Sequence, residues 1–347
     1  MIKNNFIRAL SLTLIFALLI PVMTACTNSK ELDESGIPNI EPSEDDLRVV
    51  LTIDGFDITY DVYRYFFMQY KNEYDAGNNS VWSDPEIGEE LQKSHKETVL
   101  STLKRLVAVQ KLAQKASLSV DSKSIQDTVD QAILSLYEES GKSLSKYKKA
   151  LEEQYLTHHA YRFITALEIL ESKTYTLSEQ YNIIDFTDEG ALAAIRGDEF
   201  VCVKHVFIRL DEGDSKEENL RLAEEVLAKA QAGEDFGKLI SDYDEDRDIR
   251  NFNGGYYITR YQYVEEYEKV AFALEEGEIS GIVETDSGYT IIKRCPKDDE
   301  YINEHFADFK SYYARSQFHG AIEQTLSELS DPVYGDVYSL ISVFNQK

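Results

Sequence analysis

The residues whose types could support chemistry lie between Val201 and Arg294. His205 stands in the stretch VCVKHVFIRL, where the alternation of side chains predicts a strand. Asp246 lies within an acidic run, DYDEDRD. An imidazole and a carboxylate can together polarise the hydrogen bonds around a bound ligand. Two simpler interpretations stay open, because such a histidine can be a core residue bonded to a neighbour and such a run can be a solvated loop.

Other kinds of catalytic or cofactor site have no support in the sequence. It contains no phosphate-binding glycine loop, no P-loop lysine and no Gly-x-Ser-x-Gly. No group of cysteines and histidines has zinc-site spacing. His158 and His159 are adjacent, so they do not face the same way on a helix, and no carboxylate or cysteine accompanies them at ligand spacing. We therefore expect no metal and no cofactor.

The elements around His205 and Asp246 predict a compact α+β unit. A strand at Val201–Leu210 precedes a helix that ends near Gly233, a typical C-cap residue. A second helix follows, and Gly254-Gly255 then marks a turn or a close backbone approach. A short third helix ends near Gly277, and a last strand closes the unit.

The order of these pieces resembles the parvulin family of peptidyl-prolyl isomerases. The matching stretches are KHVFI, AGEDFGKLISDYDED, GG, YEKVAFALEEGEISGIV and TDSGYTIIK. The most specific are AFAL at Ala271–Leu274 and GEIS at Gly277–Ser280. The resemblance implies a small antiparallel sheet flanked by helices, and catalysis of rotation about X–Pro bonds. That rotation is slow by itself, because the planar amide resists twisting by roughly 18–20 kcal/mol.

The resemblance also implies which residues form the site. The catalytic residues would be His205, Asp246 and Thr290. The residues bordering the proline pocket would be Tyr263, Tyr267 and Phe272. Thr290 stands where the family has a second histidine, and the two tyrosines stand where it has Met or another apolar residue and Phe. The chain is thus predicted to be an isomerase, or alternatively a parvulin-fold chaperone with weak or no catalysis.

Composition limits the partners. The 347 residues suggest two or three domains, and the formal net charge is −27. This charge argues against nucleic acid, which requires basic surface, and against charge-driven binding to anionic lipids. A positively charged or unfolded polypeptide fits better, and the 23 Tyr and 16 Phe offer contact area for one.

The amino terminus is typical of a targeting segment. Lys3 and Arg8 precede the apolar stretch Ala9–Val22, which is too short to span a membrane. The segment ends in MTAC and resembles a bacterial lipobox, which implies that Cys26 is lipidated; ordinary secretory cleavage is the alternative. We expect residues 1–25 to be a signal peptide and residues 26–46 a flexible tether. The protein would then be lipid-anchored at the extracytoplasmic face of the cell membrane.

The rest of the chain predicts a second, mostly helical domain. It would occupy residues 47–198, be interrupted by the parvulin-like domain at 199–297, and resume with a C-terminal helix at 298–347 that packs back on it. The opening strand and these helices resemble the chaperone part of PrsA-type and SurA-type foldases. This implies binding of unfolded secreted polypeptides containing X–Pro bonds, and leaves open a homodimer. A solute receptor would instead show βαβ repeats in two lobes, which are not seen.

Two cysteines follow Cys26 in the chain. In a parvulin-like sheet the first and last strands are antiparallel neighbours, so the resemblance places Cys202 close to Cys295. Alternation then puts both on the face opposite His205. We predict a cross-strand disulfide between them, with two free buried thiols as the alternative.

Overall fold

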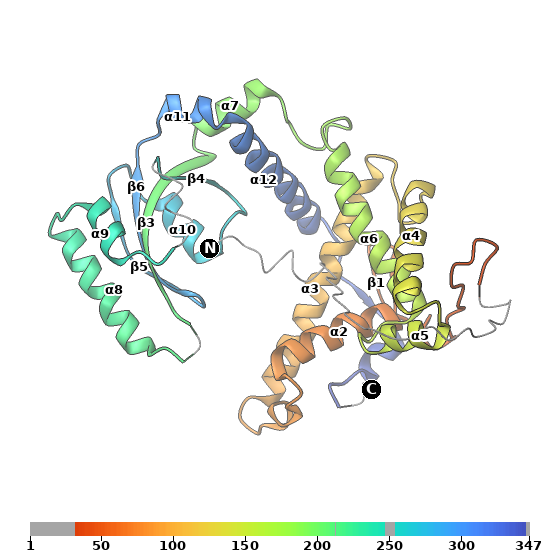
Figure 1. The fold of residues 1–347 in the computed structure, drawn as a ribbon. Helices are drawn as coiled ribbons and strands as arrows, with labels where there is room; N and C mark the ends of the chain where they lie inside the picture. The colour runs from red at the N-terminus through yellow and green to blue at the C-terminus, as the bar shows by residue number, and fades with distance from the viewer. Residues whose placement is uncertain (1–31, 212, 247–253, 345–347) are drawn as a thin grey trace. The chain divides into compact units, whose positions relative to one another are not determined.

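The computed structural model describes residues 32–211, 213–246 and 254–344. The predicted signal peptide, Cys26 and the first part of the tether lie outside these residues. Contacts divide the chain into two compact units (Figure 1). The sheet unit is Ile184–Gly320. The helical unit comprises the described residues before 184 and after 320.

The sheet unit is built on four antiparallel strands in the order β4-β3-β6-β5. These strands are β3 (Phe200–Arg209), β4 (Tyr256–Thr259), β5 (Ile279–Thr285) and β6 (Gly288–Cys295). The accompanying helices are α7 (Asp188–Arg196), α8 (Lys216–Gln231), α9 (Phe236–Tyr243), α10 (Glu265–Ala273), α11 (Asp299–Glu304) and α12 (Phe306–Ser327). The predicted α+β fold with a small antiparallel sheet is confirmed.

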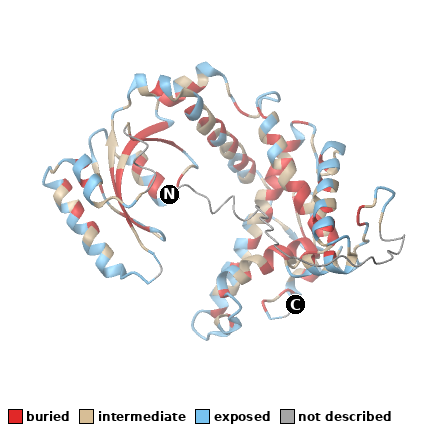
Figure 2. Cartoon of the chain, in the orientation of Figure 1, coloured by how far each residue is buried: buried red, intermediate tan, exposed pale blue. Residues whose placement is uncertain are grey.

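Both faces of this sheet are covered. Side chains on one face of β3 pack against α10, whereas those on the other face pack against α7 and α12 at one end and against α8 and α9 at the other. β3 is therefore buried along most of its length (Figure 2). Because side chains alternate along a strand, His205 shares the α10 face with Val201 and Val203.

Local signals explain where several helices begin and end. In the described part of the chain, the side chains of five α-helix N-cap residues accept a hydrogen bond from a backbone N–H in the first helical turn: Thr157, Thr187, Ser215, Asp235 and Asp298. Gly233 follows α8 with φ of 85°, a left-handed conformation that glycine adopts without a steric penalty. The predicted end of the helix near Gly233 is confirmed, with Ala232 as the cap residue and Gly233 directly after it.

The helical unit begins with a hairpin of β1 (Val49–Ile53) and β2 (Phe56–Thr59). Its helices are α2 (Tyr60–Asp75), α3 (Gly88–Gln114), α4 (Lys123–Glu139), α5 (Leu144–Glu152) and α6 (His158–Leu177), with 3-10 turns η1 (Asn79–Ser83) and η3 (Asp336–Leu340). The short strand β7 (Val333–Tyr334) pairs with β1. Strand β7, near the end of the described chain, is thus the third strand of the sheet that β1 and β2 form.

The structure differs from the sequence analysis near the carboxyl terminus. The region expected to be one helix is two, because His305 leaves the helical conformation between α11 and α12. Contacts place α7, α11 and residues 306–320 of α12 with the sheet unit, and residues 321–344 with the helical unit. The boundaries expected for the two family domains, at residues 198 and 298, stay predictions.

The described end of the predicted tether, residues 32–46, forms turns. The Asp33 carboxylate accepts hydrogen bonds from the backbone N–H groups of Ser35 and Ile37, at 2.8 and 2.9 Å. Ile37 is buried. Within the described ranges, no helix is both long and apolar enough to cross a membrane.

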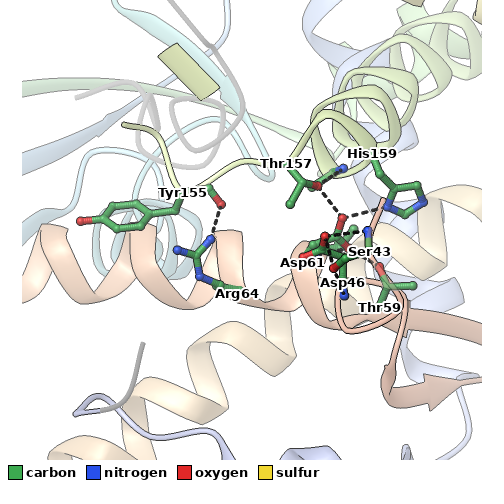
Figure 3. A network of polar contacts seen from close by, with 10 residues as sticks. Ser43, Asp46, Thr59, Asp61, Arg64, Tyr155, Thr157 and His159 are labelled. Atoms are coloured by element: carbon green, nitrogen blue, oxygen red, sulfur yellow. Dashed lines mark hydrogen bonds and ion pairs between the residues drawn. The ribbon is translucent and has the colours of Figure 1, made fainter. Parts of the chain in front are cut away.

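A buried carboxylate joins the starts of α2 and α6 (Figure 3). Asp61 accepts hydrogen bonds from the hydroxyls of Thr59 and Thr157, each at 2.6 Å, and lies 2.9 Å from Nδ1 of His159. Burial would raise the pKa of Asp61, but the hydrogen bonds from His159, Thr157 and Thr59 outweigh it and lower that pKa. The same hydrogen bond raises the pKa of His159. His158 instead meets the Tyr147 hydroxyl at 2.8 Å.

The His159–Asp61 pair should make stability depend on pH. Because the pKa of His159 is raised in the folded state, its contribution is complete below the ordinary value of 6.5 and is lost as pH rises through the raised value. The Asp61 contribution persists throughout this window, since its lowered pKa lies below 3.8. His159→Gln should therefore cost about 1 kcal/mol at mildly acidic pH, and less in alkaline buffer.

Thermal unfolding of wild type and His159→Gln across neutral pH checks this. The difference in melting temperature should shrink as pH rises, and comparing the two proteins cancels the titration of the other histidines. A difference that stays constant with pH would show that the pair carries no charge-dependent stability.

Candidate active site

His205 is the centre of the candidate site. Its side chain is only 3% exposed. Nδ1 lies 2.9 Å from the Tyr267 hydroxyl, and Nε2 lies 3.0 Å from Oδ2 of Asp246. The ring also stacks on Tyr256, with centroids 4.9 Å apart and planes 4° from parallel. The imidazole therefore has a partner at each nitrogen and on one face.

These partners fix the protonation state of His205. An ionised carboxylate can only accept, so Nε2 carries the proton and donates to Asp246. Burial lowers the pKa of His205 more than Asp246 raises it, so the ring is neutral and Nδ1 keeps a lone pair. Burial also raises the pKa of Tyr267, whose hydroxyl keeps its proton and donates to Nδ1. The donors point in one direction, from Tyr267 through His205 to Asp246.

Asp246 reaches His205 because the segment after α9 runs along the edge of β3. The N–H of Glu245 donates to the carbonyl oxygen of Phe207 at 2.9 Å. The Asp244 carboxylate accepts from the N–H of Phe207 at 2.7 Å and from the N–H of Asp246 at 3.2 Å. Burial raises the pKa of Asp244 to about 7. Asp244 thus holds Asp246 in place, and Asp246 in turn orients the His205 ring.

Asp246 also accepts a second hydrogen bond. The Tyr256 hydroxyl donates to its Oδ2 at 3.0 Å, so this oxygen receives both Tyr256 and His205. Burial raises the pKa of Tyr256 well above its ordinary value, with the charge of Asp246 as the next cause. Tyr256, whose ring stacks on His205, therefore hydrogen-bonds to the same carboxylate as the imidazole.

The two tyrosines that were predicted to border a pocket lie against each other beside His205. Tyr263 and Tyr267 are 5% and 1% exposed, and their rings stack with centroids 5.0 Å apart. The loop before α10 is held by Glu268, whose carboxylate accepts from the N–H groups of Tyr261, Gln262 and Tyr263 at 3.0, 2.6 and 2.7 Å. Tyr261 has φ of 64°, an unfavourable conformation for a tyrosine that these hydrogen bonds maintain.

Thr290 and Phe272 lie at the border of the site. Thr290 pairs with Phe207 across β6 and β3 and is 1% exposed. Its hydroxyl has no hydrogen-bond partner among the described residues. Phe272 is partly buried on α10, and the Arg260 guanidinium carbon lies 3.6 Å from the centroid of its ring. The structure therefore joins His205 directly to Asp246 and Tyr267, but not to Thr290.

Three residues of this arrangement were not predicted. Tyr256 could have been found, since β4 pairs it with Val203 and the diagonal neighbour on that face is His205. Asp244 stands in an acidic run, and Glu268 stands among other glutamates. Nothing in the sequence therefore indicates that their carboxylates accept hydrogen bonds from backbone N–H groups. The catalytic and pocket roles expected for the other residues stay predictions.

Two different protein-family models match two separate parts of the chain. Residues 205–295 match the family model of the PPIC-type PPIase domain, and residues 2–175, half of the chain, match that of the SurA-like N-terminal domain. The foldase protein PrsA of Oceanobacillus iheyensis is 29% identical over 258 residues, covering 73% of this chain and 77% of the relative. That of Caldanaerobacter subterraneus is 25% identical over 287 residues, covering 81% and 84%.

Among solved structures, PrsA from Bacillus anthracis covers 65% of this chain and 96% of its own, at 18% identity. Its TM-score of 0.34 reflects a poor overall superposition, so the assignment rests on the sequence matches. Both family models match, and the PrsA relatives span most of the chain. The chain belongs to the PrsA/SurA-like foldases, with a SurA-like N-terminal domain and a parvulin-type peptidyl-prolyl isomerase domain.

Proposed function

We propose that this chain accelerates cis/trans isomerisation of X–Pro bonds in unfolded exported polypeptides, and that its helical unit binds those chains. The observation that carries the proposal is the neutral His205, held between the Tyr267 hydroxyl and the Asp246 carboxylate. Relatives named as foldase protein PrsA support the same activity.

The proposed chemistry is selective binding of the twisted amide, with no covalent step. In the planar amide the nitrogen lone pair is shared with the carbonyl, whereas in the twisted amide it is localised on the proline nitrogen. Only interactions that are stronger in the twisted form accelerate rotation. In this proposal Tyr263, Tyr267 and Phe272 border the proline, while the hydrogen bond to His205 fixes the orientation of the Tyr267 hydroxyl.

Thr290 has a specific place in this proposal. Its hydroxyl is buried with no partner among the residues that the structure describes, and such a group destabilises a fold unless something pairs with it. We assign it to the bound peptide, as a donor to the amide that twists. This replaces an imidazole donor with a smaller hydroxyl on the same strand.

The proposal also places the chain at the outer face of the cell membrane, anchored by lipid on Cys26. The basic residues Lys3 and Arg8, the apolar stretch Ala9–Val22 and the MTAC sequence support this. A two-chain lipid would anchor the protein firmly, with residues 26–46 as the tether. Cell fractionation tests the anchor, since Cys26→Ser should move the protein from the membrane to the soluble fraction.

A second candidate function has one observation in its favour. Tyr263 and Tyr267 are almost fully buried against each other, which leaves little of their ring surface free for a proline. The chain would then be a peptide-binding chaperone that kept the parvulin fold with weak or no catalysis.

A refolding assay limited by proline isomerisation separates the two functions. The wild-type chain should accelerate the slow phase, and His205→Ala should reduce that acceleration at least about tenfold, the equivalent of about 1.4 kcal/mol in the barrier. His305→Ala, in the segment between α11 and α12, is a matched control that should keep full activity. Suppression of client aggregation without any acceleration would contradict the isomerase and support the chaperone.

Thr290→Val tests the unpaired hydroxyl, because valine keeps the branched shape and removes only the polar group. Stability should rise by about 1 kcal/mol, since an unsatisfied buried hydroxyl is removed. Isomerase activity should fall about tenfold, as expected for one lost hydrogen bond to the twisted amide. The measurements are denaturant unfolding and the same refolding assay, with Thr290→Ser retaining activity. Unchanged activity in the valine variant would exclude a role for this hydroxyl in catalysis.

A further inference from the structure

A pair of thiols lies on the sheet face opposite the candidate active site. Cys202 of β3 and Cys295 of β6 are directly opposite in the strand register, so their side chains lie next to each other on one face of the sheet. Opposed residues on antiparallel strands have Cα atoms about 4.5–5.5 Å apart, within the range of about 4.4–6.8 Å that a disulfide spans. Both cysteines are free in this structure, so the disulfide expected from the sequence stays a prediction.

The two thiols differ in access and acidity. Cys202 is fully buried, whereas Cys295 is partly exposed at the end of β6. The neighbouring Cys202 thiol lowers the pKa of Cys295 to about 6, and burial works against this shift. The same interaction and burial raise the pKa of Cys202. These properties suit Cys295 to be the attacking thiolate and Cys202 to be the resolving thiol in a disulfide exchange.

Two lysines lie beside the thiols on the same face. Lys204 and Lys293 are opposite each other in the register, two residues from the cysteine pair on each strand, and both are partly exposed. Like charges directly opposite on neighbouring strands are unfavourable, so a thiolate or a bound anion beside them is stabilised. The other titratable neighbours are Tyr257, Tyr301 and Lys297.

We propose that Cys202 and Cys295 form a redox-active dithiol that exchanges with anionic low-molecular-weight disulfides, of which glutathione disulfide is the probe. The Cys295 thiolate attacks one sulfur of the small disulfide, forms a mixed disulfide and releases one small thiolate. Cys202 then gives up its proton to water and attacks Cys295 Sγ, which closes the protein disulfide and releases the second small thiolate. Two protein thiols are oxidised while one small disulfide is reduced to two thiols.

This dithiol is separate from the proposed isomerase site, although the two share strands. Cys202 Sγ donates to the carbonyl oxygen of Gly254 at 3.4 Å, at the turn that leads into β4. Its side chain packs with α7, α11 and α12, on the face opposite His205. The exchange chemistry therefore does not rest on isomerase activity, and it can be measured when that activity is absent.

The test uses the full chain with Cys26→Ser, so that Cys202 and Cys295 carry the remaining thiols. Incubation with glutathione disulfide, quenching by acid and mass spectrometry should show loss of two hydrogen atoms from the intact chain, reversed by excess glutathione. Cystamine, a cationic small disulfide, should react at least about tenfold more slowly, because the two lysines repel it. Thiols that stay reduced, or that only cross-link two chains, would overturn the proposal.

Single substitutions assign the two roles. Cys202→Ser should accumulate a stable mixed disulfide between glutathione and Cys295, because the resolving thiol is gone. Cys295→Ser should leave the buried Cys202 unmodified under the same conditions. Equal labelling of the two variants would overturn the assigned roles, and circular dichroism establishes that each variant is folded.

Discussion

A buried imidazole with both nitrogens paired is the constraint on which the sheet unit depends. An unpaired nitrogen of His205 would leave a buried polar atom without a partner, at a cost of about 1–3 kcal/mol. Three elements must therefore meet around β3: α10 brings Tyr267, β4 brings Tyr256, and the segment after α9 brings Asp246. The packing of α10 on this sheet face supplies Tyr267, and the pairing of β4 with β3 supplies Tyr256. The hydrogen bond from the N–H of Glu245 to the carbonyl oxygen of Phe207 supplies Asp246.

Buried and half-buried carboxylates connect neighbouring segments in both units of this acidic chain. Asp61 joins α2 to α6, Asp244 holds Asp246 against β3, and Glu268 holds the loop that carries Tyr263. Asp75 does the same for the turn after α2, accepting from Lys71, Trp82 and the N–H of Gly77. In each case a carboxylate with several acceptor sites satisfies two or more donors that would otherwise be unpaired. The high count of acidic residues therefore includes structural groups as well as solvated ones.

The sequence predicted the scaffold better than the contacts within the site. Alternation in β3, the helical spacing after it and the glycine at 233 are local signals, and the structure follows them. The register that puts Cys202 opposite Cys295 also followed from the expected strand order. The hydrogen bonds of Asp244 and Glu268 could not be predicted, because they depend on backbone N–H groups whose position relative to these side chains only the folded structure defines. The break at His305 was missed for a similar reason, since neighbouring residues favour helix on both sides.

The hydrogen bonding proposed for the active site depends on the protonation state of His205, which can be measured. Nitrogen NMR of isotope-labelled histidine side chains, with His205→Gln to assign the signal, distinguishes the charged ring from the two neutral tautomers. We expect the His205 ring to be neutral, with its proton on Nε2. The ring should stay neutral through the pH range in which exposed histidines titrate. A charged imidazolium at neutral pH, or a proton on Nδ1, would contradict the direction of hydrogen bonding from Tyr267 to Asp246 and the proposed basis of isomerisation.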